Sequence, residues 1–119
     1  MKIAISSLGQ DLDSQIDPRF GRAAYILIID TVHKGVEVFD NSENLNAFKG
    51  AGIQAAAMLS KKGVEVLLTG YCGPNAYKTL LAAGVKVVND VSGKVKGAVD
   101  AFIEGNLAFA DSANAEAHW

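Results

Sequence analysis

The first candidate for chemistry is the only cysteine, Cys72, which lies in a glycine-rich turn. The turn, Gly70-Tyr71-Cys72-Gly73, separates an apolar run from a predicted helix that begins at Pro74. Proline is favoured at the first helical position because an N–H there has no intrahelical partner. Such a turn exposes backbone N–H groups beside the positive end of the helix dipole, which attracts anions. A thiol there is expected to ionise more readily than a free one, so Cys72 is a candidate metal ligand.

Two arginines form a second candidate group. Arg19 and Arg22 flank Phe20 and Gly21 in a long predicted loop, residues 8–22, and loops of this length are usually functional or mobile. Two readings stay open. The arginines are solvated, with Asp17 as a partner, or they form a mobile cationic flap over an anionic ligand, because arginine presents several donors in a fixed fork.

The remaining candidates carry weaker signals. Cys72 itself has a plain alternative, since a free cysteine is often a small buried hydrophobic residue. His33 and His118 are predicted in a turn and a tail, so they do not form a metal site. Four further residues are considered: Ser6 and Ser7 at the end of a strand, and Gly50 and Gly52, which permit close approach of a ligand or of another helix.

The order of predicted elements is βββαβαβα, which indicates an α/β fold. β-branched apolar runs predict the strands, and Gly63 and Gly84 end two helices. The βαβ steps require parallel strands with helices on both faces, while an early hairpin adds an antiparallel strand. The predicted strands are 2–7, 25–30, 36–39, a run from 64 and 85–88; the helices are 50–62, 74–83 and one capped by Ser92.

This order has consequences for the site and for the ends of the chain. If the first and fourth strands are neighbours, Ser6, Ser7 and the turn 70–72 face one crevice, with the loop 17–22 above it. The polar stretch 41–49 is expected to connect elements on the surface. Ile53, Leu81 and Ile103 are expected in the core. Residues 1–107 are expected to form one domain, and residues 108–119 a flexible tail.

Composition narrows the classes of function. The chain has 119 residues, a formal net charge of -2 and scattered basic residues, which argues against a nucleic-acid binder. One cysteine excludes an internal disulfide and fits a reducing cytoplasm. No apolar run approaches the roughly 20 residues needed to span a bilayer, and no signal peptide is evident, so a cytoplasmic location away from membranes is expected. Phosphate-loop motifs and a set of catalytic carboxylates are missing, which favours a binding protein over an enzyme.

Three motifs in order carry a family resemblance: IDPRFGRA after the first strand, GAGIQAA at the first helix, and LLTGYCGPNA. Together they resemble the dinitrogenase iron–molybdenum cofactor biosynthesis family, from about Lys2 to Leu107. The resemblance implies a three-layer, five-stranded mixed sheet of the ribonuclease H-like type. It also implies a protein that holds metal–sulfur clusters. One stand-alone, single-domain member from sulfate-reducing bacteria holds a molybdenum–copper sulfide cluster without a cage of cysteines, and this short chain is similar to such members.

The function expected from these observations is that of a non-enzymatic carrier of an anionic metal–sulfur cluster. The cargo is of the molybdenum–copper sulfide or iron–molybdenum cofactor type, and the partners are proteins that donate or accept it. One thiolate cannot replace the four of a conventional iron–sulfur site, so hydrogen bonds, charge and shape, or sharing between subunits, must hold the cluster. An alternative is a regulatory module that binds a phosphate-bearing small molecule or a partner protein in the same crevice. The predicted cofactor-binding residues are Ser6, Ser7, Arg19, Phe20, Arg22, Gly70, Tyr71, Cys72, Gly73 and Asn75, with Cys72 as the metal ligand.

Overall fold

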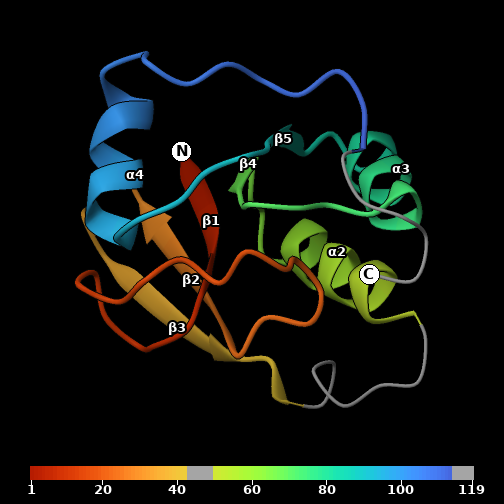
Figure 1. Cartoon of the computed structure of the whole chain (residues 1–119), viewed down its shortest axis with the longest axis horizontal. Coiled ribbons are helices and arrows are strands. Elements are labelled where there is room, and N and C mark those ends of the chain that lie inside the picture. The colour runs from red at the N-terminus through yellow and green to blue at the C-terminus, as the bar shows by residue number, and fades with distance from the viewer. Residues whose placement is uncertain (43–49, 114–119) are drawn as a thin grey trace.

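The computed structural model describes residues 1–42 and 50–113 and shows a five-stranded mixed sheet between two layers of helices (Figure 1). Helix α4 covers one face of the sheet, and α2 and α3 cover the other. The predicted α/β class and the order of the elements are confirmed. The bounds are β1 (Lys2–Ser7), β2 (Tyr25–Asp30), β3 (Val36–Asp40), α2 (Ala51–Lys61), β4 (Val66–Leu68), α3 (Pro74–Ala82), β5 (Lys86–Val88) and α4 (Val95–Ile103).

Strand β1 lies at the centre of the sheet, whose order is β3-β2-β1-β4-β5. It pairs antiparallel with β2 and parallel with β4, where Ile5 lies opposite Leu68. The predicted adjacency of the first and fourth strands is therefore confirmed. Because parallel strands end at the same edge of a sheet, the loops that follow β1 and β4 begin next to each other at that edge.

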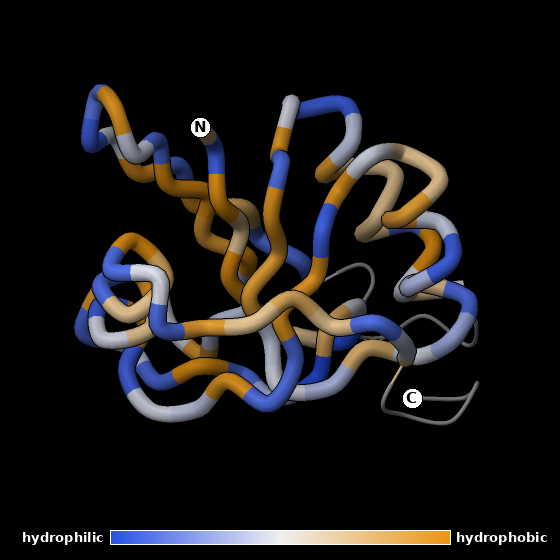
Figure 2. The backbone as a smooth tube through the Cα atoms, turned by 90° about the horizontal axis from the view of Figure 1, so that it is seen from above, coloured by the Kyte–Doolittle hydropathy of each residue, from blue (hydrophilic) through white to orange (hydrophobic). Residues whose placement is uncertain are grey.

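Alternation along the strands builds two apolar cores, one on each face of the sheet. Ala4 of β1 faces α2 and α3, while its neighbours Ile3 and Ile5 face α4. The strands are correspondingly the most hydrophobic part of the chain (Figure 2). The buried side chains of α2 include Ala55 and Ala56, which let the helix lie close to the sheet.

Three apolar residues expected in the core are instead exposed: Ile53 by 44%, Leu81 by 49% and Ile103 by 61%. Ile53 lies midway between the buried Ala51 and Ala55 in the chain, so it points away from the buried side of α2. Ile103 is the last residue of α4. In α3, Leu80 takes the core position, which turns the next residue outward.

Residues 108–113, which fall in the predicted tail, contact the rest of the fold. The Ala110 N–H donates to the Val87 carbonyl at 2.7 Å, and the Tyr77 hydroxyl donates to the Ala110 carbonyl at 3.0 Å. The Phe109 ring lies 6.2 Å from that of Phe102, edge to face. This segment crosses from α4 to α3 and covers the edge of β5, which would otherwise be open (Figure 1). Residues 114–119, including His118, lie outside the described part.

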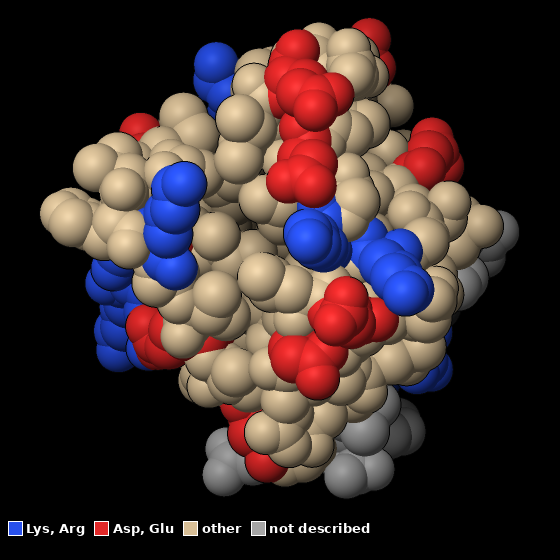
Figure 3. Space-filling model, turned by 90° about the vertical axis from the view of Figure 1, so that its left-hand side faces the viewer, with Lys and Arg blue, Asp and Glu red and all other residues tan. Residues whose placement is uncertain are grey.

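The face formed by α4 carries acidic and basic side chains interspersed with one another (Figure 3). No large field of one sign is visible on this face. Among residues 1–42 and 50–113, no helix has both the length and the hydropathy needed to cross a bilayer.

Candidate anion-binding site

The long loop after β1 is anchored along its backbone. The Asp17 N–H donates to the Ser6 carbonyl at 3.0 Å, and the Val95 N–H of α4 donates to the Ser14 carbonyl at 2.9 Å. The loop is therefore held against β1 and α4 by backbone hydrogen bonds. It also caps α4, whose first residue is Val95 and whose N-cap position is Lys94 rather than the predicted Ser92.

A short parallel pairing joins this loop to the glycine-rich turn after β4. The Tyr71 N–H donates to the Pro18 carbonyl at 2.6 Å, and the Phe20 N–H donates to the Tyr71 carbonyl at 3.1 Å. The predicted placement of the loop beside the turn is confirmed. It requires Gly70, since a Cβ there would lie 2.8 Å from the Pro18 Cα.

This pairing decides which side chains face solvent, because successive side chains in an extended segment point to opposite sides. The paired residues Arg19 and Tyr71 are exposed, with 44% of the arginine side chain and 40% of the tyrosine accessible. The next residues, Phe20 and Cys72, are 3% and 0% exposed and belong to the core beneath α2 and α3. The outward-facing pair is thus an arginine and a tyrosine.

Burial reverses the expected chemistry of Cys72. Desolvation raises the pKa of the thiol from 9.0 to about 12, so the expectation that it ionises readily is wrong. A helix N-terminus offers about 0.3–1 kcal/mol to a nearby anion. Removing a thiolate from water costs more than this, so desolvation dominates. The geometry gives no support to Cys72 as a metal ligand, and Phe20 is a core residue.

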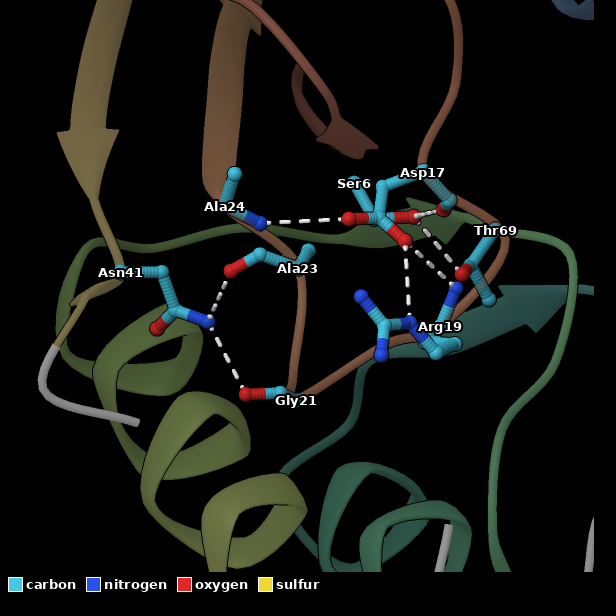
Figure 4. A network of polar contacts seen from close by, with 8 residues as sticks. All are labelled: Ser6, Asp17, Arg19, Gly21, Ala23, Ala24, Asn41 and Thr69. Carbon is cyan, nitrogen blue, oxygen red and sulfur yellow. Dashed lines mark hydrogen bonds and ion pairs between the residues drawn. The ribbon is translucent and has the colours of Figure 1, made fainter. Parts of the chain in front are cut away.

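A buried carboxylate, that of Asp17, accepts hydrogen bonds from the backbone of the loop (Figure 4). Asp17, 1% exposed, accepts the Arg19 N–H at 3.1 Å and the Ala24 N–H at 3.2 Å, and its Oδ1 lies 3.6 Å from Arg19 Nε. The reading that pairs an arginine with Asp17 is therefore confirmed for Arg19. The carboxylate fixes both the backbone and the side chain of that residue.

The hydroxyls of the two serines at the end of β1 form hydrogen bonds within the protein. The Ser6 hydroxyl donates to the Asp17 carbonyl at 2.7 Å and lies 2.8 Å from the Thr69 hydroxyl. The Ser7 hydroxyl donates to the Gly9 carbonyl at 2.8 Å. Both serines are fully buried, so they hold the loop against β1 and β4 and do not present hydroxyls to a ligand.

Asn41, at the end of β3, is a residue that the sequence reasoning missed. It was expected in a surface connection, yet it is 1% exposed. Its Nδ2 donates to the carbonyls of Gly21 and Ala23, each at 2.9 Å (Figure 4). A single polar residue after a strand gives no periodic signal that distinguishes it from a loop residue. The rest of that predicted connection, residues 43–49, lies outside the described part.

Close packing brings the N-termini of two helices to the same loop. Gly21 has a φ of +91°, and a Cβ on it would lie 2.7 Å from the Gly52 Cα in the first turn of α2. A Cβ on Gly52 would lie 2.8 Å from the Ala76 Cβ in the first turn of α3. The loop with Arg19 and Arg22, the start of α2 and the start of α3 are therefore in direct contact.

Neither of these two helices neutralises its own positive end. The N-cap residues are Gly50 and Gly73, which have no side chain to cap with, and neither first turn contains an acidic residue. In α4, by contrast, the N–H groups of Val95 and Lys96 donate to loop carbonyls. Two positive dipole ends and the exposed guanidinium of Arg19 thus meet at one corner, which we call the anion corner.

The predicted turn donors are only partly available at the anion corner. The Tyr71 N–H is occupied by Pro18, whereas Gly73 and the exposed Asn75 begin α3. Among the described residues, no group of three or more His, Cys, Asp or Glu side chains is placed to hold a metal ion. The chemistry of the corner is therefore recognition of negative charge by N–H groups and a guanidinium.

Comparison with known proteins places these features in context. The model of the family described as dinitrogenase iron-molybdenum cofactor matches residues 1–105. The structure of the apo form of the orange protein from Desulfovibrio gigas is similar at 43% identity and a TM-score of 0.93, over 96% of each chain. A putative NifB protein from Thermotoga shares 41% identity, with a TM-score of 0.83 over 96% of this chain and 97% of the other. No curated protein matches the chain.

A putative dinitrogenase from Methanocaldococcus jannaschii is more distant. It shares 25% identity, with a TM-score of 0.68 over 94% of this chain and 96% of the other. The fold therefore extends over nearly the whole length of all three similar proteins.

Proposed function

Because the chain belongs to the dinitrogenase iron–molybdenum cofactor family, we propose that it is a non-enzymatic carrier that holds an anionic metal–sulfur cluster at the anion corner. Family membership and the likeness to the orange protein support a small binding or carrier protein. The observation that carries the proposal is the meeting of the α2 and α3 N-termini beside Arg19. The cargo is a molybdenum–copper sulfide or an iron–molybdenum cofactor.

The residues of the corner suit a cluster held without a sulfur bridge from the protein. Thiometallates are anions with sulfide on their outside, and backbone N–H groups of Gly73 and Asn75 donate toward such a charge. Arg19 adds a cation with several donors. Tyr71, beside it, offers an aromatic surface to the weakly hydrated sulfide. The arrangement does not use Cys72, because its side chain is buried in the core and burial raises the pKa of its thiol.

Reversible binding of this kind fits a carrier. Hydrogen bonds and charge can be exchanged for those of another protein without breaking a metal–thiolate bond. The proposed partners are therefore proteins that donate the cluster and proteins that accept it.

Anaerobic reconstitution tests the proposal. Apo-protein is mixed with tetrathiomolybdate and copper, or with isolated iron–molybdenum cofactor, and is then desalted. We expect a visible chromophore and bound metal in a fixed ratio to protein with at least one cargo. Arg19→Gln should lower retention, whereas Lys96→Gln, which makes the same charge change on exposed α4, should not. Loss of all metal from the wild-type protein with both cargoes would refute the proposal.

The alternative ligand is a phosphate-bearing small molecule, because two helix N-termini attract phosphate as well as sulfide clusters. A ligand that binds only the native state raises the melting temperature. A thermal-shift series with nucleotides, inorganic phosphate and tetrathiomolybdate separates the two. Stabilisation by nucleotides alone would favour a regulatory module over a cluster carrier.

A further inference from the structure

We propose that Asp17 is a positioning residue that sets the orientation in which the Arg19 guanidinium meets the cargo; this inference rests on the proposed function. Asp17 is 1% exposed, so its carboxylate does not itself reach a ligand. Arg19, by contrast, is accessible over 44% of its side chain. A buried carboxylate therefore lies behind the exposed cation of the anion corner.

The peptide unit between Pro18 and Arg19 is fixed at both of its polar ends. Its carbonyl accepts from the Tyr71 N–H at 2.6 Å, and its N–H donates to Asp17 Oδ1 at 3.1 Å. The next N–H along the chain, that of Phe20, donates to the Tyr71 carbonyl at 3.1 Å. Because the backbone is held before and after Arg19, its side chain leaves the loop in one direction.

The carboxylate of Asp17 also acts on the guanidinium itself (Figure 4). Arg19 Nε lies 3.6 Å from Asp17 Oδ1, which is longer than a hydrogen bond, so the attraction is one between charges. In the part of the chain that the structure describes, no other residue forms a hydrogen bond or ion pair with this guanidinium. Its other donors can therefore bind an anion, for which arginine offers parallel N–H groups in a fixed fork.

Asp17 is in turn anchored to the centre of the sheet. Its backbone N–H donates to the Ser6 carbonyl at 3.0 Å, and its carbonyl accepts from the Ser6 hydroxyl at 2.7 Å. The other carboxylate oxygen, Oδ2, accepts the Ala24 N–H at 3.2 Å. Ser6 belongs to β1, the central strand, so the carboxylate is a rigid support for a group that contacts a ligand.

The charge of Asp17 and its positioning role predict opposite effects on binding. A carboxylate behind the site repels an anion, so removal of its charge alone would tighten binding. Removal of the group that orients Arg19 would instead release the guanidinium and weaken binding. The sign of the change therefore distinguishes the two.

A double-mutant cycle with the isosteric Asp17→Asn and with Arg19→Gln measures this sign. The probe is tetrathiomolybdate with copper, and the readouts are the cluster dissociation constant and the melting temperature of the apo-protein. We expect Asp17→Asn alone to weaken binding by at least about tenfold, as for other groups that orient a ligand-binding side chain. In the Arg19→Gln background the same substitution should tighten binding by about two- to threefold, because only the repulsion remains to be removed.

Two controls separate orientation from surface charge and from stability. Asp13→Asn removes one charge from an exposed position in the same loop and should leave the dissociation constant within about twofold of the wild-type value. Val99→Ala removes buried volume under α4, on the opposite face of the sheet. It should lower the melting temperature and leave the dissociation constant unchanged.

Arg19→Lys tests the inference without altering the buried carboxylate, and it replaces the cycle if Asp17→Asn does not fold. Lysine keeps the charge but has neither Nε nor a fork of donors, so Asp17 cannot orient it as it orients arginine. We expect Arg19→Lys to weaken binding nearly as much as Arg19→Gln does.

Four results would overturn the inference and leave the proposed function intact. They are tighter or unchanged binding by Asp17→Asn, an equal weakening by Asp17→Asn in both backgrounds, wild-type affinity of Arg19→Lys, and a weakening by Val99→Ala as large as that by Asp17→Asn. A wild-type protein that binds no cluster would refute the proposed function, and the inference with it.

Discussion

Cys72 and Tyr71 are adjacent in the chain, yet only Tyr71 reaches the surface of the anion corner. The sequence predicts the turn, its glycines and the helix that follows it, but not which of the two side chains faces outward. That choice depends on the pairing of Tyr71 with the backbone at Pro18 and Phe20, which is a contact distant in sequence. The pairing directs Cys72 inward, where desolvation controls its pKa.

Cys72 in the native protein should therefore react slowly with iodoacetamide. At pH 8 we expect alkylation roughly two to three orders of magnitude slower than in the denatured protein, because the thiolate is the reactive form. Mass spectrometry of samples quenched over time measures the two rates. Similar rates in the native and denatured protein would show that the sulfur is accessible.

The same burial gives a pH dependence of stability. The pKa of Cys72 is raised in the folded protein, so unfolding at high pH releases a proton from the thiol. This contribution to stability is fully present below pH 9 and is lost as the pH rises toward 12. Cys72→Ala should show a smaller loss of stability than the wild-type protein over that interval when both are unfolded with denaturant.

Helices and strands follow from the sequence more reliably than their contacts do. β-branched runs and the glycines after α2 and α3 predict the order of elements, because these signals are local. Contacts between elements depend on the three-dimensional arrangement of the chain and not on local signals, as Gly52 shows. The sequence indicates that Gly52 permits close approach of a ligand or of another helix, but not which one. The structure places it against Ala76 of α3 and against Gly21.

Gly52 and Gly97 should respond in opposite ways to alanine. Both are helical, and alanine is ordinarily more stable there by roughly 0.5–1 kcal/mol. A Cβ at Gly97 meets nothing within 4 Å, so Gly97→Ala should stabilise the protein by about that amount. A Cβ at Gly52 would lie 2.8 Å from the Ala76 Cβ, so Gly52→Ala should destabilise it by about 1–3 kcal/mol.

Denaturant unfolding of the two variants beside the wild-type protein gives these values. Gly52→Ala should also weaken cluster binding, because α2 and α3 would separate at their N-termini. Equal stabilisation by both substitutions would show that the two helices are not in the close contact that the anion corner requires.

The whole molecule has few of the signals that would identify a binding site from sequence alone. Its net charge is -2, although the proposed cargo is an anion. The attraction is local: it comes from helix ends, which carry no charge in the sequence, and from Arg19, one of the two arginines in the chain. Composition could therefore argue against a nucleic-acid surface, but it could not reveal the anion corner. The glycine-rich turn before α3 supplied the expectation of an anion site, and the fold brings the start of α2 into contact with the start of α3.

The C-terminal segment is a second feature that the sequence alone does not predict. Its alanine-rich sequence lacks periodicity and predicts a flexible tail, yet residues through 113 cover the edge of β5. The contacts of Phe109 with Lys86, and of Ala110 with Tyr77, join parts of the chain far apart in sequence. Such contacts leave no periodic pattern in the sequence, so they cannot be predicted from it.

The most direct test is to follow the backbone amide resonances during titration with tetrathiomolybdate and copper, in the wild-type protein and in Cys72→Ser. We predict that the largest shifts fall in the first turns of α2 and α3, from Ala51 to Ile53 and at Gly73, Asn75 and Ala76. The pattern and the affinity should be nearly the same without the sulfur. Shifts centred on α4, or binding abolished by Cys72→Ser, would contradict an anion held by helix N-termini and arginine.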